Sequence, residues 1–377
     1  MGNKAVIIDA VRSPIGVKNG QMVGIRPDDL TAQVVQGLLD RNEKVNPNQM
    51  EDLVVGCAFP EGPQGMLISR SAGALAGLPQ SVPGKVVNRF CGSAMDAVHQ
   101  VSTAIESGDV DAGIAAGVED MFSIPPGGFA PDFHPELAEQ EYYIGMGETA
   151  ENLAKDGNIS REDQEAFAIQ SHEKALSAWE EGKFDNEVVP VDMYGEVKIT
   201  KDEGPRVPDV EKIKSLGPAF VENGTVTAAT SSPFSIGAAA LLITSEKFAK
   251  ENGLAIRAEI VSRAVAGVDW TRMGMGPIPA TNKALEKAGL KIEDIEVIEL
   301  NEAFAAQALY VIQEGGWDPD KVNLNGGAVA LGHPLGSSGA RIIGTLMNLM
   351  EQQDKHLGLA TMCIGTGQGI TTIIKRP

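Results

Sequence analysis

The segment Glu51-Asp52-Leu53-Val54-Val55 has a similar counterpart later in the chain. Glu293-Asp294-Ile295-Glu296-Val297-Ile298 also has an acidic pair followed by a mainly apolar run. The second copy starts 242 positions after the first (293 − 51 = 242), and the same spacing separates His333 from Cys91. Apolar and amphipathic stretches alternate around both copies, which is typical of an α/β fold with parallel or mixed sheets. We therefore expect two duplicated α/β domains, with Cys91 and His333 in equivalent turns that converge.

The repeat divides the chain into three predicted domains. Residues 1–118 form an N-terminal domain that residues 232–254 complete, and residues 255–377 form a C-terminal domain. The stretch 119–231 has no counterpart in the other half, so we expect an inserted loop domain that acts as a lid or as a substrate-binding subdomain. Within it, Ser160-Arg161-Glu162-Asp163 is a capping box and predicts the start of a helix.

The composition argues against several classes of function. The net charge of −20 argues against binding to nucleic acid or to an anionic membrane. The longest apolar stretches, such as Ala238 to Thr244, are too short to span a bilayer, and no signal or transit peptide is expected. Three widely spaced cysteines predict neither a disulfide framework nor a metal site. We therefore expect a cytoplasmic protein of 377 residues with two or three domains.

The first reactive turn is Asn88-Arg89-Phe90-Cys91-Gly92-Ser93-Ala94-Met95, between a predicted strand and a predicted helix. A helix N-terminus is expected to lower the pKa of Cys91, and a histidine would supply the base that its thiol needs. The alternative is a buried structural cysteine, the usual fate of a free cysteine. Cys57 keeps that structural interpretation, because its position in the repeat has no histidine partner.

Glycine crowds two further turns. His333 lies in a loop with five glycines between residues 326 and 339, and is either a catalytic base or a solvent-facing loop residue. Cys363 opens the second turn, Cys363-Ile364-Gly365-Thr366-Gly367. Glycines allow backbone N–H groups to approach a reacting carbonyl closely. Asn301, after the predicted strand 297–300, is a site residue, a helix N-cap, or both. The pattern indicates covalent acyl chemistry on cysteine.

Taken together, these motifs resemble the thiolase family along the whole chain. The turns around Cys91 and Cys363 are most similar to those of bacterial fatty-acid β-oxidation 3-ketoacyl-CoA thiolases (acetyl-CoA acyltransferases). The resemblance implies the thiolase fold: two duplicated α/β domains in five layers, α-β-α-β-α, with an inserted loop domain. The matching segments are Asn88 to Ser93, Gly145-Met146-Gly147-Glu148-Thr149-Ala150-Glu151-Asn152, Ile159 to Gln164, Gly224 to Ala228, Asn301-Glu302-Ala303-Phe304, Gly332-His333-Pro334 and Cys363-Ile364-Gly365.

The resemblance also implies a division of catalytic labour. Cys91 attacks the 3-keto carbonyl of a 3-ketoacyl-CoA, and His333 takes the proton from its thiol. Cys363 protonates the departing acetyl-CoA enolate and later activates the incoming CoA. His333 and a water held by Asn301 serve the enolate oxygen, while the backbone N–H groups of Cys91 and Gly365 serve the acyl oxyanion. The implied reaction is CoA-dependent cleavage to acetyl-CoA and a shortened acyl-CoA.

Substrate-binding residues follow from the same resemblance. Ser232 matches a serine that contacts pantetheine. Short-chain biosynthetic members carry a histidine where this chain has Gly145, which favours a degradative enzyme with room for longer acyl chains. The residues implied to bind substrate or CoA are Ser232, Met146, Phe220, Ala303 and Phe304.

The resemblance implies no permanently bound cofactor, with coenzyme A as a substrate. The implied partners are a second copy of the chain, in a homodimer or higher homo-oligomer, and a multifunctional β-oxidation α-subunit is a further candidate. Two alternatives stay open: a short-chain acetoacetyl-CoA thiolase, and a non-catalytic thiolase-fold protein that binds lipid or CoA. Non-catalytic members tend to lose the cysteine or histidine, whereas this chain retains Cys91, His333, Cys363 and Asn301.

Overall fold

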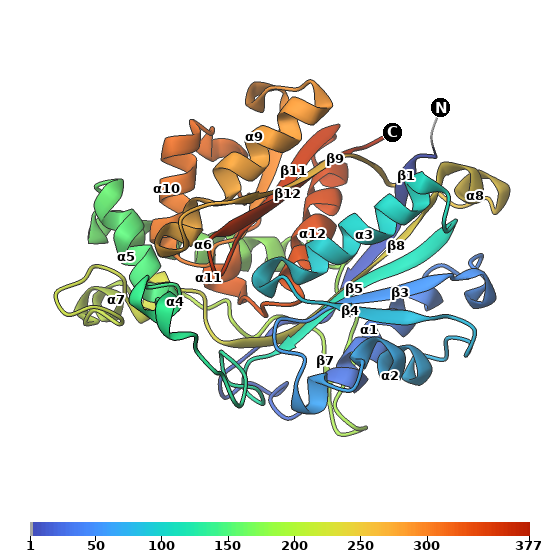
Figure 1. The fold of residues 1–377 in the computed structure, drawn as a ribbon, viewed down its shortest axis with the longest axis horizontal. Helices are drawn as coiled ribbons and strands as arrows, with labels where there is room; N and C mark the ends of the chain where they lie inside the picture. Colours follow the sequence, from blue (N-terminus) through green and yellow to red (C-terminus); the bar gives the residue numbers. More distant parts are fainter. Residues whose placement is uncertain (1–2) are drawn as a thin grey trace.

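The computed structural model describes residues 3–377, and a mixed sheet of ten strands runs through it (Figure 1). Nine strands follow one path, in the order β10-β11-β12-β9-β1-β8-β5-β3-β4, and β2 pairs with β8. Two short strands, β6 and β7, form a separate pair. The strands are β1 (Ala5–Arg12), β2 (Gly16–Val17), β3 (Asp52–Gly56), β4 (Gly84–Val87), β5 (Ala112–Asp120), β6 (Val191–Asp192), β7 (Lys198–Ile199), β8 (Ser235–Ser245), β9 (Ala258–Gly267), β10 (Val297–Leu300), β11 (Leu357–Ile364) and β12 (Gln368–Lys375).

Twelve α-helices accompany these strands in the described chain. Half of them pack on strands of the sheet, and four lie in the segment between β5 and β8. The helices are α1 (Pro27–Asp40), α2 (Ile68–Leu75), α3 (Ser93–Ser107), α4 (Pro135–Glu139), α5 (Met146–Asp156), α6 (Arg161–Glu180), α7 (Val210–Ser215), α8 (Glu246–Glu251), α9 (Pro277–Ala288), α10 (Ala305–Gly315), α11 (Ala328–Leu331) and α12 (Ser338–Gln352). None of the helices within residues 3–377 has the length and apolar character needed to cross a membrane.

The sheet is built twice from the same plan. β1 and β9 join the halves through only two residue pairs, Val6 with Glu259 and Ile7 with Ala258. On one side of this joint the order is β8, β5, β3, and on the other it is β12, β11, β10. The pairs β3–β5 and β10–β11 are parallel, whereas β5–β8 and β11–β12 are antiparallel. The expected duplication of an α/β unit with mixed sheets is therefore confirmed.

Five layers result from the way in which helices cover the two half-sheets. α3 and α12 lie between the halves, pack on each other, and contact strands of both (Figure 1). α1 packs on β8, β5 and β1 on one outer face, and α9 packs on β9, β12 and β11 on the other. This is the α-β-α-β-α arrangement that the family resemblance implied.

The two central helices begin unusually close to the neighbouring backbone. A Cβ atom added at Gly339, in the first turn of α12, would lie 2.4 Å from the backbone nitrogen of Met95 in α3. One added at Gly117 in β5 would lie 2.3 Å from the carbonyl oxygen of Gly336. Real Cβ atoms do not approach backbone this closely, so glycine at these positions lets the segments meet. The loop before α12 is thereby held against β5 and α3.

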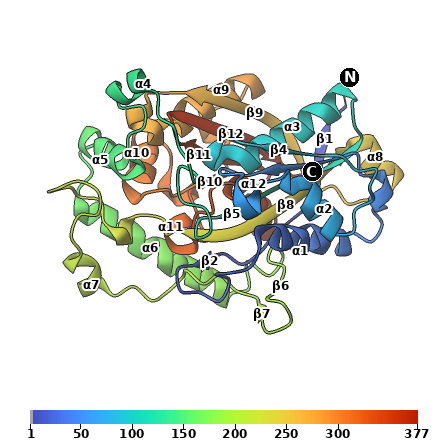
Figure 2. The same ribbon diagram turned by 60° about the horizontal axis from the view of Figure 1, so that its bottom comes forward.

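The segment between β5 and β8 leaves the sheet and holds α4 to α7, on one side of the molecule (Figure 2). The capping box at the start of α6 is confirmed, because Ser160 and Asp163 each bond the other's backbone N–H. This segment returns to the sheet through buried ion pairs. Arg12 in β1 binds Glu187 at 2.6 Å and Asp202 at 2.7 Å.

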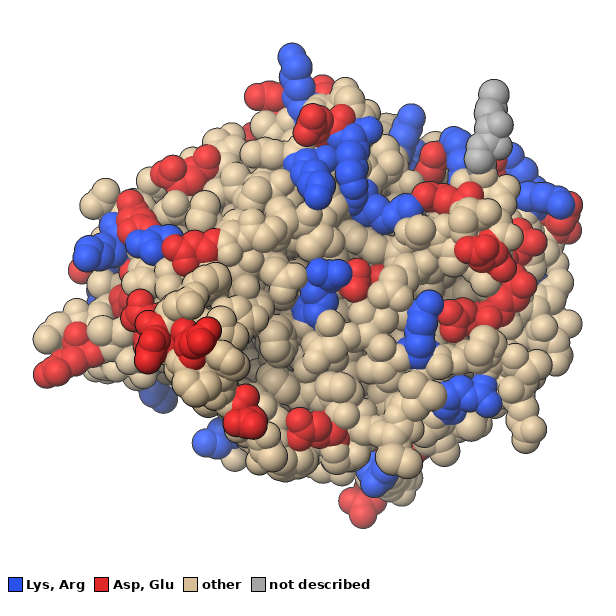
Figure 3. Space-filling view, viewed as in Figure 1, with Lys and Arg blue, Asp and Glu red and all other residues tan. Residues whose placement is uncertain are grey.

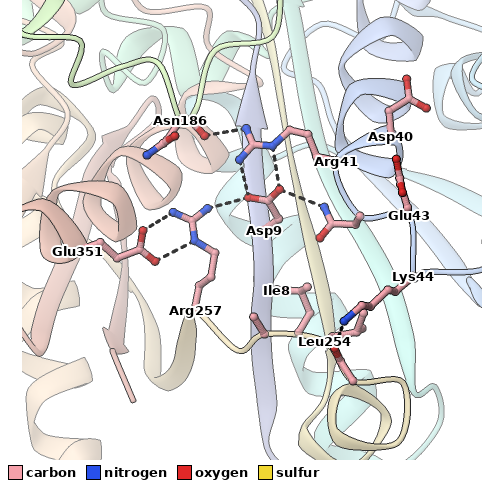
Figure 4. A pocket seen from close by; sticks show the side chains of 13 residues that line it. Ile8, Asp9, Asp40, Arg41, Glu43, Lys44, Asn186, Leu254, Arg257 and Glu351 are labelled. Atoms are coloured by element: carbon pink, nitrogen blue, oxygen red, sulfur yellow. Dashed lines mark hydrogen bonds and ion pairs between the residues drawn. The ribbon is translucent and has the colours of Figure 1, made fainter.

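A surface cavity of about 630 Å³ marks where the two halves meet beside the middle of β1 (Figure 4). Asp9, near the middle of β1, lies at its centre. Its carboxylate accepts hydrogen bonds from Arg257 at 2.7 Å, Asn42 at 3.0 Å and Arg41 at 3.3 Å. Because Arg257 comes directly before β9 in the C-terminal half, Asp9 ties the halves together beside their narrow joint.

Substitution Asp9→Asn should lower the free energy of unfolding by about 2–3 kcal/mol, because two guanidinium groups would then face each other without an anion between them. Urea unfolding followed by circular dichroism measures this. The matched control is Lys4→Gln, which removes the exposed Lys4–Glu259 pair across the same joint. It should leave stability within experimental error. Equal losses in both variants would contradict the role given to Asp9.

Candidate active site

Cys91 lies in a tight turn between β4 and α3, as the sequence predicted. The turn is a single 3₁₀ turn, Phe90–Gly92, and Phe90 has a positive φ of 42°. The backbone N–H of Gly365, from the other half of the chain, is directed at the Cys91 sulfur. Burial nevertheless raises the pKa of Cys91 to about 11, outweighing this N–H and the N–H of Cys91 itself. The expectation that the helix N-terminus would lower this pKa was wrong, because desolvation of the thiolate costs more.

His333 is buried, with 4% of its surface exposed, so the alternative of a solvent-facing loop residue is wrong. Its Nδ1 lies 2.6 Å from the Ser338 hydroxyl, and that hydroxyl donates to the carbonyl of Pro334 at 3.0 Å. The hydroxyl has one hydrogen and therefore accepts from Nδ1–H. Nε2 is left as the unprotonated nitrogen, and it lies 3.3 Å from Nδ2 of Asn301. This tautomer leaves Nε2 able to accept a proton.

The imidazole is also kept uncharged. Burial, reinforced by the positive charge of Arg341, lowers the pKa of His333 to about 3. Because a neutral imidazole and a protonated thiol are both favoured by burial, the resting site holds no thiolate–imidazolium pair. The thiol of Cys91 must therefore lose its proton during any attack on a substrate.

Strand β11 positions both Cys363, which belongs to it, and Asn301, which is hydrogen-bonded to it. The backbone N–H of Asn301 donates to the carbonyl of Thr361 at 3.0 Å, and Cys363 follows two residues later in the same strand. Cys363 is fully buried, and burial together with the neighbouring Cys91 raises its pKa. The second thiol is therefore protonated at rest, and it lies close enough to Cys91 for the two thiols to affect each other's ionisation.

Sequence reasoning missed Glu119, at the end of β5, which clamps the first half to the histidine loop. Its buried carboxylate accepts from the backbone N–H groups of Ala58 at 2.7 Å, Phe59 at 3.2 Å and Gly336 at 2.8 Å. Burial raises the pKa of Glu119, and these N–H groups oppose that shift. No local pattern marks this residue, because Gly336 lies 217 positions away in sequence.

Glu302 performs a similar task for the Asn301 turn. Its carboxylate accepts from Ser171 in α6 at 2.7 Å, from Asn323 at 2.8 Å and from the backbone of Val329 at 3.1 Å. These bonds join the turn after β10 to α6 and to the glycine-rich stretch before His333. Asn301 is not a helix N-cap, since α10 starts at Ala305 with Phe304 before it.

The predicted substrate-binding residues gather around the second thiol. The N–H of Ser232 donates to the carbonyl of Ala303 at 3.0 Å, and the rings of Phe220 and Phe304 meet edge to face at 5.8 Å. Ala303, Phe304 and Cys363 belong to one apolar cluster. Met146, the first residue of α5, reaches the turn after β11, because a Cβ added at Gly365 would lie 3.6 Å from its sulfur.

The predicted substrate-binding region is reached from solvent at a different place from the cavity at Asp9. Met146 and Phe220 are 37% and 44% exposed, so the cluster opens to solvent. Figure 3 shows a hollowed, mostly uncharged area between the inserted elements and the N-terminal end of α3, with both signs of charge around it. The cavity of Figure 4 is lined by none of the predicted site residues. Cys57 is buried beside Glu119 and its pKa is raised by burial, as expected of a structural cysteine.

Alkylation of Cys91 by iodoacetamide should accelerate about tenfold per pH unit through neutral pH, because only the thiolate reacts and its pKa is about 11. Intact-protein mass gives the rate, and Cys91→Ser is the control that should stay unmodified, since Cys57 and Cys363 are buried. A rate that is already constant below pH about 8 would contradict the neutral resting pair.

Comparison with solved structures identifies the class. The fold matches the crystal structure of the Bacillus anthracis acetyl-CoA acetyltransferase with a TM-score of 0.92 and 38% sequence identity, covering 100% of this chain and 99% of the other. Five layers, duplicated halves and a pair of thiols shared between them therefore make this an acyltransferase of the thiolase fold.

Family comparison is more specific. The model described as "Thiolase, N-terminal domain" matches residues 5–247, and "Thiolase, C-terminal domain" matches residues 254–376. The chain belongs to the thiolase family. A 3-ketoacyl-CoA thiolase of Aliivibrio fischeri is 50% identical over 384 residues, and one of Shewanella baltica is 48% identical over 385 residues. Each comparison covers 99% of both chains.

Proposed function

We propose that the protein is a 3-ketoacyl-CoA thiolase that uses CoA to cleave a 3-ketoacyl-CoA into acetyl-CoA and an acyl-CoA shortened by two carbons. The observation that carries the proposal is the direction of the Gly365 N–H toward the Cys91 sulfur, with Cys363 beside it. A reacting carbonyl bound to Cys91 would lie under donors from both halves of the chain.

The first half-reaction forms an acyl-enzyme. The Cys91 sulfur attacks C3 of the substrate while its proton passes to Nε2 of His333. The C2–C3 bond then breaks, and its electron pair stays on C2 as the enolate of acetyl-CoA. Nε2 of imidazolium His333 and Nδ2 of Asn301, which lie 3.3 Å apart, are both donors and suit the enolate oxygen. Cys363 donates its proton to C2, which a buried, protonated thiol is prepared to do.

The second half-reaction regenerates the enzyme. The Cys363 thiolate removes the thiol proton of an incoming CoA, whose sulfur attacks the acyl group on Cys91. The Cys91 sulfur leaves and recovers its proton from His333. The N–H groups of Gly365 and Cys91 would stabilise the tetrahedral oxyanion in this step. Two successive covalent steps of this kind give ping-pong kinetics.

The acyl and pantetheine groups would lie along the apolar cluster at the second thiol. The edge-to-face pair Phe220–Phe304 and the partly exposed Met146 offer apolar contacts there. Ser232 and Ala303, joined backbone to backbone, offer polar ones. We also propose that the inserted domain 119–231 serves substrate binding, between the duplicated domains 1–118 with 232–254 and 255–377.

A degradative role is favoured over a short-chain one. Gly145 precedes α5 where biosynthetic members carry histidine, which leaves room for a longer chain. The relatives named 3-ketoacyl-CoA thiolase are about 50% identical, against 38% for the acetyl-CoA acetyltransferase. A non-catalytic binding role is disfavoured because the chain retains both thiols, the histidine and the asparagine.

The physiological setting that we propose is fatty-acid β-oxidation in the cytoplasm, by a homodimer or larger homo-oligomer. Strand β4 pairs with β3 alone in the described chain, which leaves one edge free. The neighbouring helix α2 and its approach expose Met66, Leu67 and Leu75. An unpaired edge beside exposed apolar side chains suits a second copy of the chain. A multifunctional α-subunit is a further proposed partner.

Intact-protein mass tests the function. After brief exposure to a medium-chain 3-ketoacyl-CoA without free CoA, Cys91 should carry the acyl group shortened by two carbons. With acetoacetyl-CoA it should carry acetyl. An adduct from acetoacetyl-CoA alone would point to a short-chain thiolase. If neither substrate leaves an adduct while Cys91 still reacts with iodoacetamide, the proposal fails.

Cysteine variants separate the roles. Cys91→Ser should abolish the adduct and thiolysis. Cys363→Ala should lower kcat by at least about 100-fold, because it removes the acid and base of both half-reactions. Cys57→Ala is the matched control, because it also removes one buried thiol, and it should retain kcat within about threefold. Equal losses in Cys57→Ala and Cys363→Ala would contradict a catalytic role for Cys363.

A further inference from the structure

Helix α12, which starts five residues after His333, carries a buried polar stripe. Thirteen of its 15 residues are buried. Ser338, Arg341, Thr345 and Asn348 follow one another at intervals of three, four and three residues, so they share one face of the helix. Ser338 holds His333, and Thr345 and Asn348 donate to Glu187 at 3.1 and 3.0 Å. Arg341 belongs to this stripe, and the proposed catalytic mechanism gives it no role.

Arg341 faces Glu299 of β10. The two charged groups are 3.6 Å apart, and their side chains are only 3% and 1% exposed. None of the three guanidinium nitrogens has a hydrogen-bond partner among the described residues, and neither does one oxygen of Glu299. Glu299 is two residues before Asn301, and residues two apart in an extended strand point to the same side. Two parallel links result: Ser338–His333–Asn301 and Arg341–Glu299.

We propose that Arg341 and Glu299 are positioning residues for His333: their buried ion pair holds the helix that carries Ser338 against the strand that leads directly into Asn301. Stability alone does not account for such a pair. Two charges without further hydrogen bonds recover little of their desolvation cost, and apolar side chains of similar size would pack at least as well. An apolar pair would not fix the register of α12 against β10, and it would not place a positive charge near the imidazole of His333.

The charges around this pair support the assignment. Arg341 faces Glu299 from β10, Glu302 from the turn after it, Glu187 from the segment after α6, and Arg12 from β1. Lys174 of α6 also acts on Glu299. Burial raises the pKa of Glu299, and the charge of Arg341 opposes this shift. His333 has Arg341 as the charged neighbour that perturbs it, and that charge lowers its pKa.

The inference rests on the proposed thiolysis, in which neutral His333 is the base. Arg341→Gln should therefore lower kcat about 10-fold to 100-fold with little change in KM, because the base loses its alignment. It should also move the acid limb of kcat/KM upward by about one to three pH units, because the pKa of His333 rises when the cation is removed. A base with a higher pKa is protonated, and lost, at a higher pH. Arg341→Lys keeps the charge and should keep the acid limb near that of the wild type.

The experiment records kcat/KM against pH for these variants and follows His333 directly by NMR of labelled histidine. If Arg341→Gln does not fold, Arg341→Met with Glu299→Leu replaces it, since an apolar pair should fold and still shift the limb. An unchanged His333 titration in the charge-removing variant, or an equal shift in Arg341→Lys, would overturn the inference. Wild-type enzyme without thiolysis would overturn the proposed function instead, and the His333 titration would still decide the role of Arg341.

Discussion

The close approach of α3 and α12 to the backbone around them is the constraint on which the rest of the structure depends. Glycine at 339 and at 117 lets the start of α12 and the loop before it lie against α3 and β5 with no room for a Cβ. Each central helix follows one reactive turn, so bringing the helix starts together brings Cys91 and His333 toward one place. The carboxylate of Glu119 then fixes that contact by accepting the N–H of Gly336.

Burial gives the site its chemistry as well as its shape. Desolvation raises the pKa of Cys91 and lowers that of His333, so both groups rest uncharged. A neutral pair avoids the cost of two buried charges until a substrate carbonyl is present to take up the developing negative charge. In the proposed reaction, the N–H of Gly365 lies at the sulfur as this charge develops, and the protonated thiol of Cys363 can donate to the enolate that follows. At rest the site therefore contains hydrogen-bond donors and protonated thiols, and it contains no thiolate.

Much of this could be predicted from sequence, for identifiable reasons. The 242-residue repeat fixed the equivalence of Cys91 and His333, because duplicated segments fold alike, and the capping box at Ser160 is a local signal. The pKa of Cys91 could not be predicted in the right direction, since it depends on burial by residues from the other half. Glu119 and Arg341 were missed because their partners lie far away in sequence, and a lone acidic or basic residue carries no local signature.

The central claim is that one acyl group is held by donors from both halves of the chain. The most direct test is a crystal structure of the enzyme trapped with an acyl group after reaction with a 3-ketoacyl-CoA. The account predicts the acyl carbon on the Cys91 sulfur, with its carbonyl oxygen within hydrogen-bond distance of the backbone nitrogens of Cys91 and Gly365. An acyl group on Cys363, or a carbonyl oxygen directed away from Gly365, would contradict it.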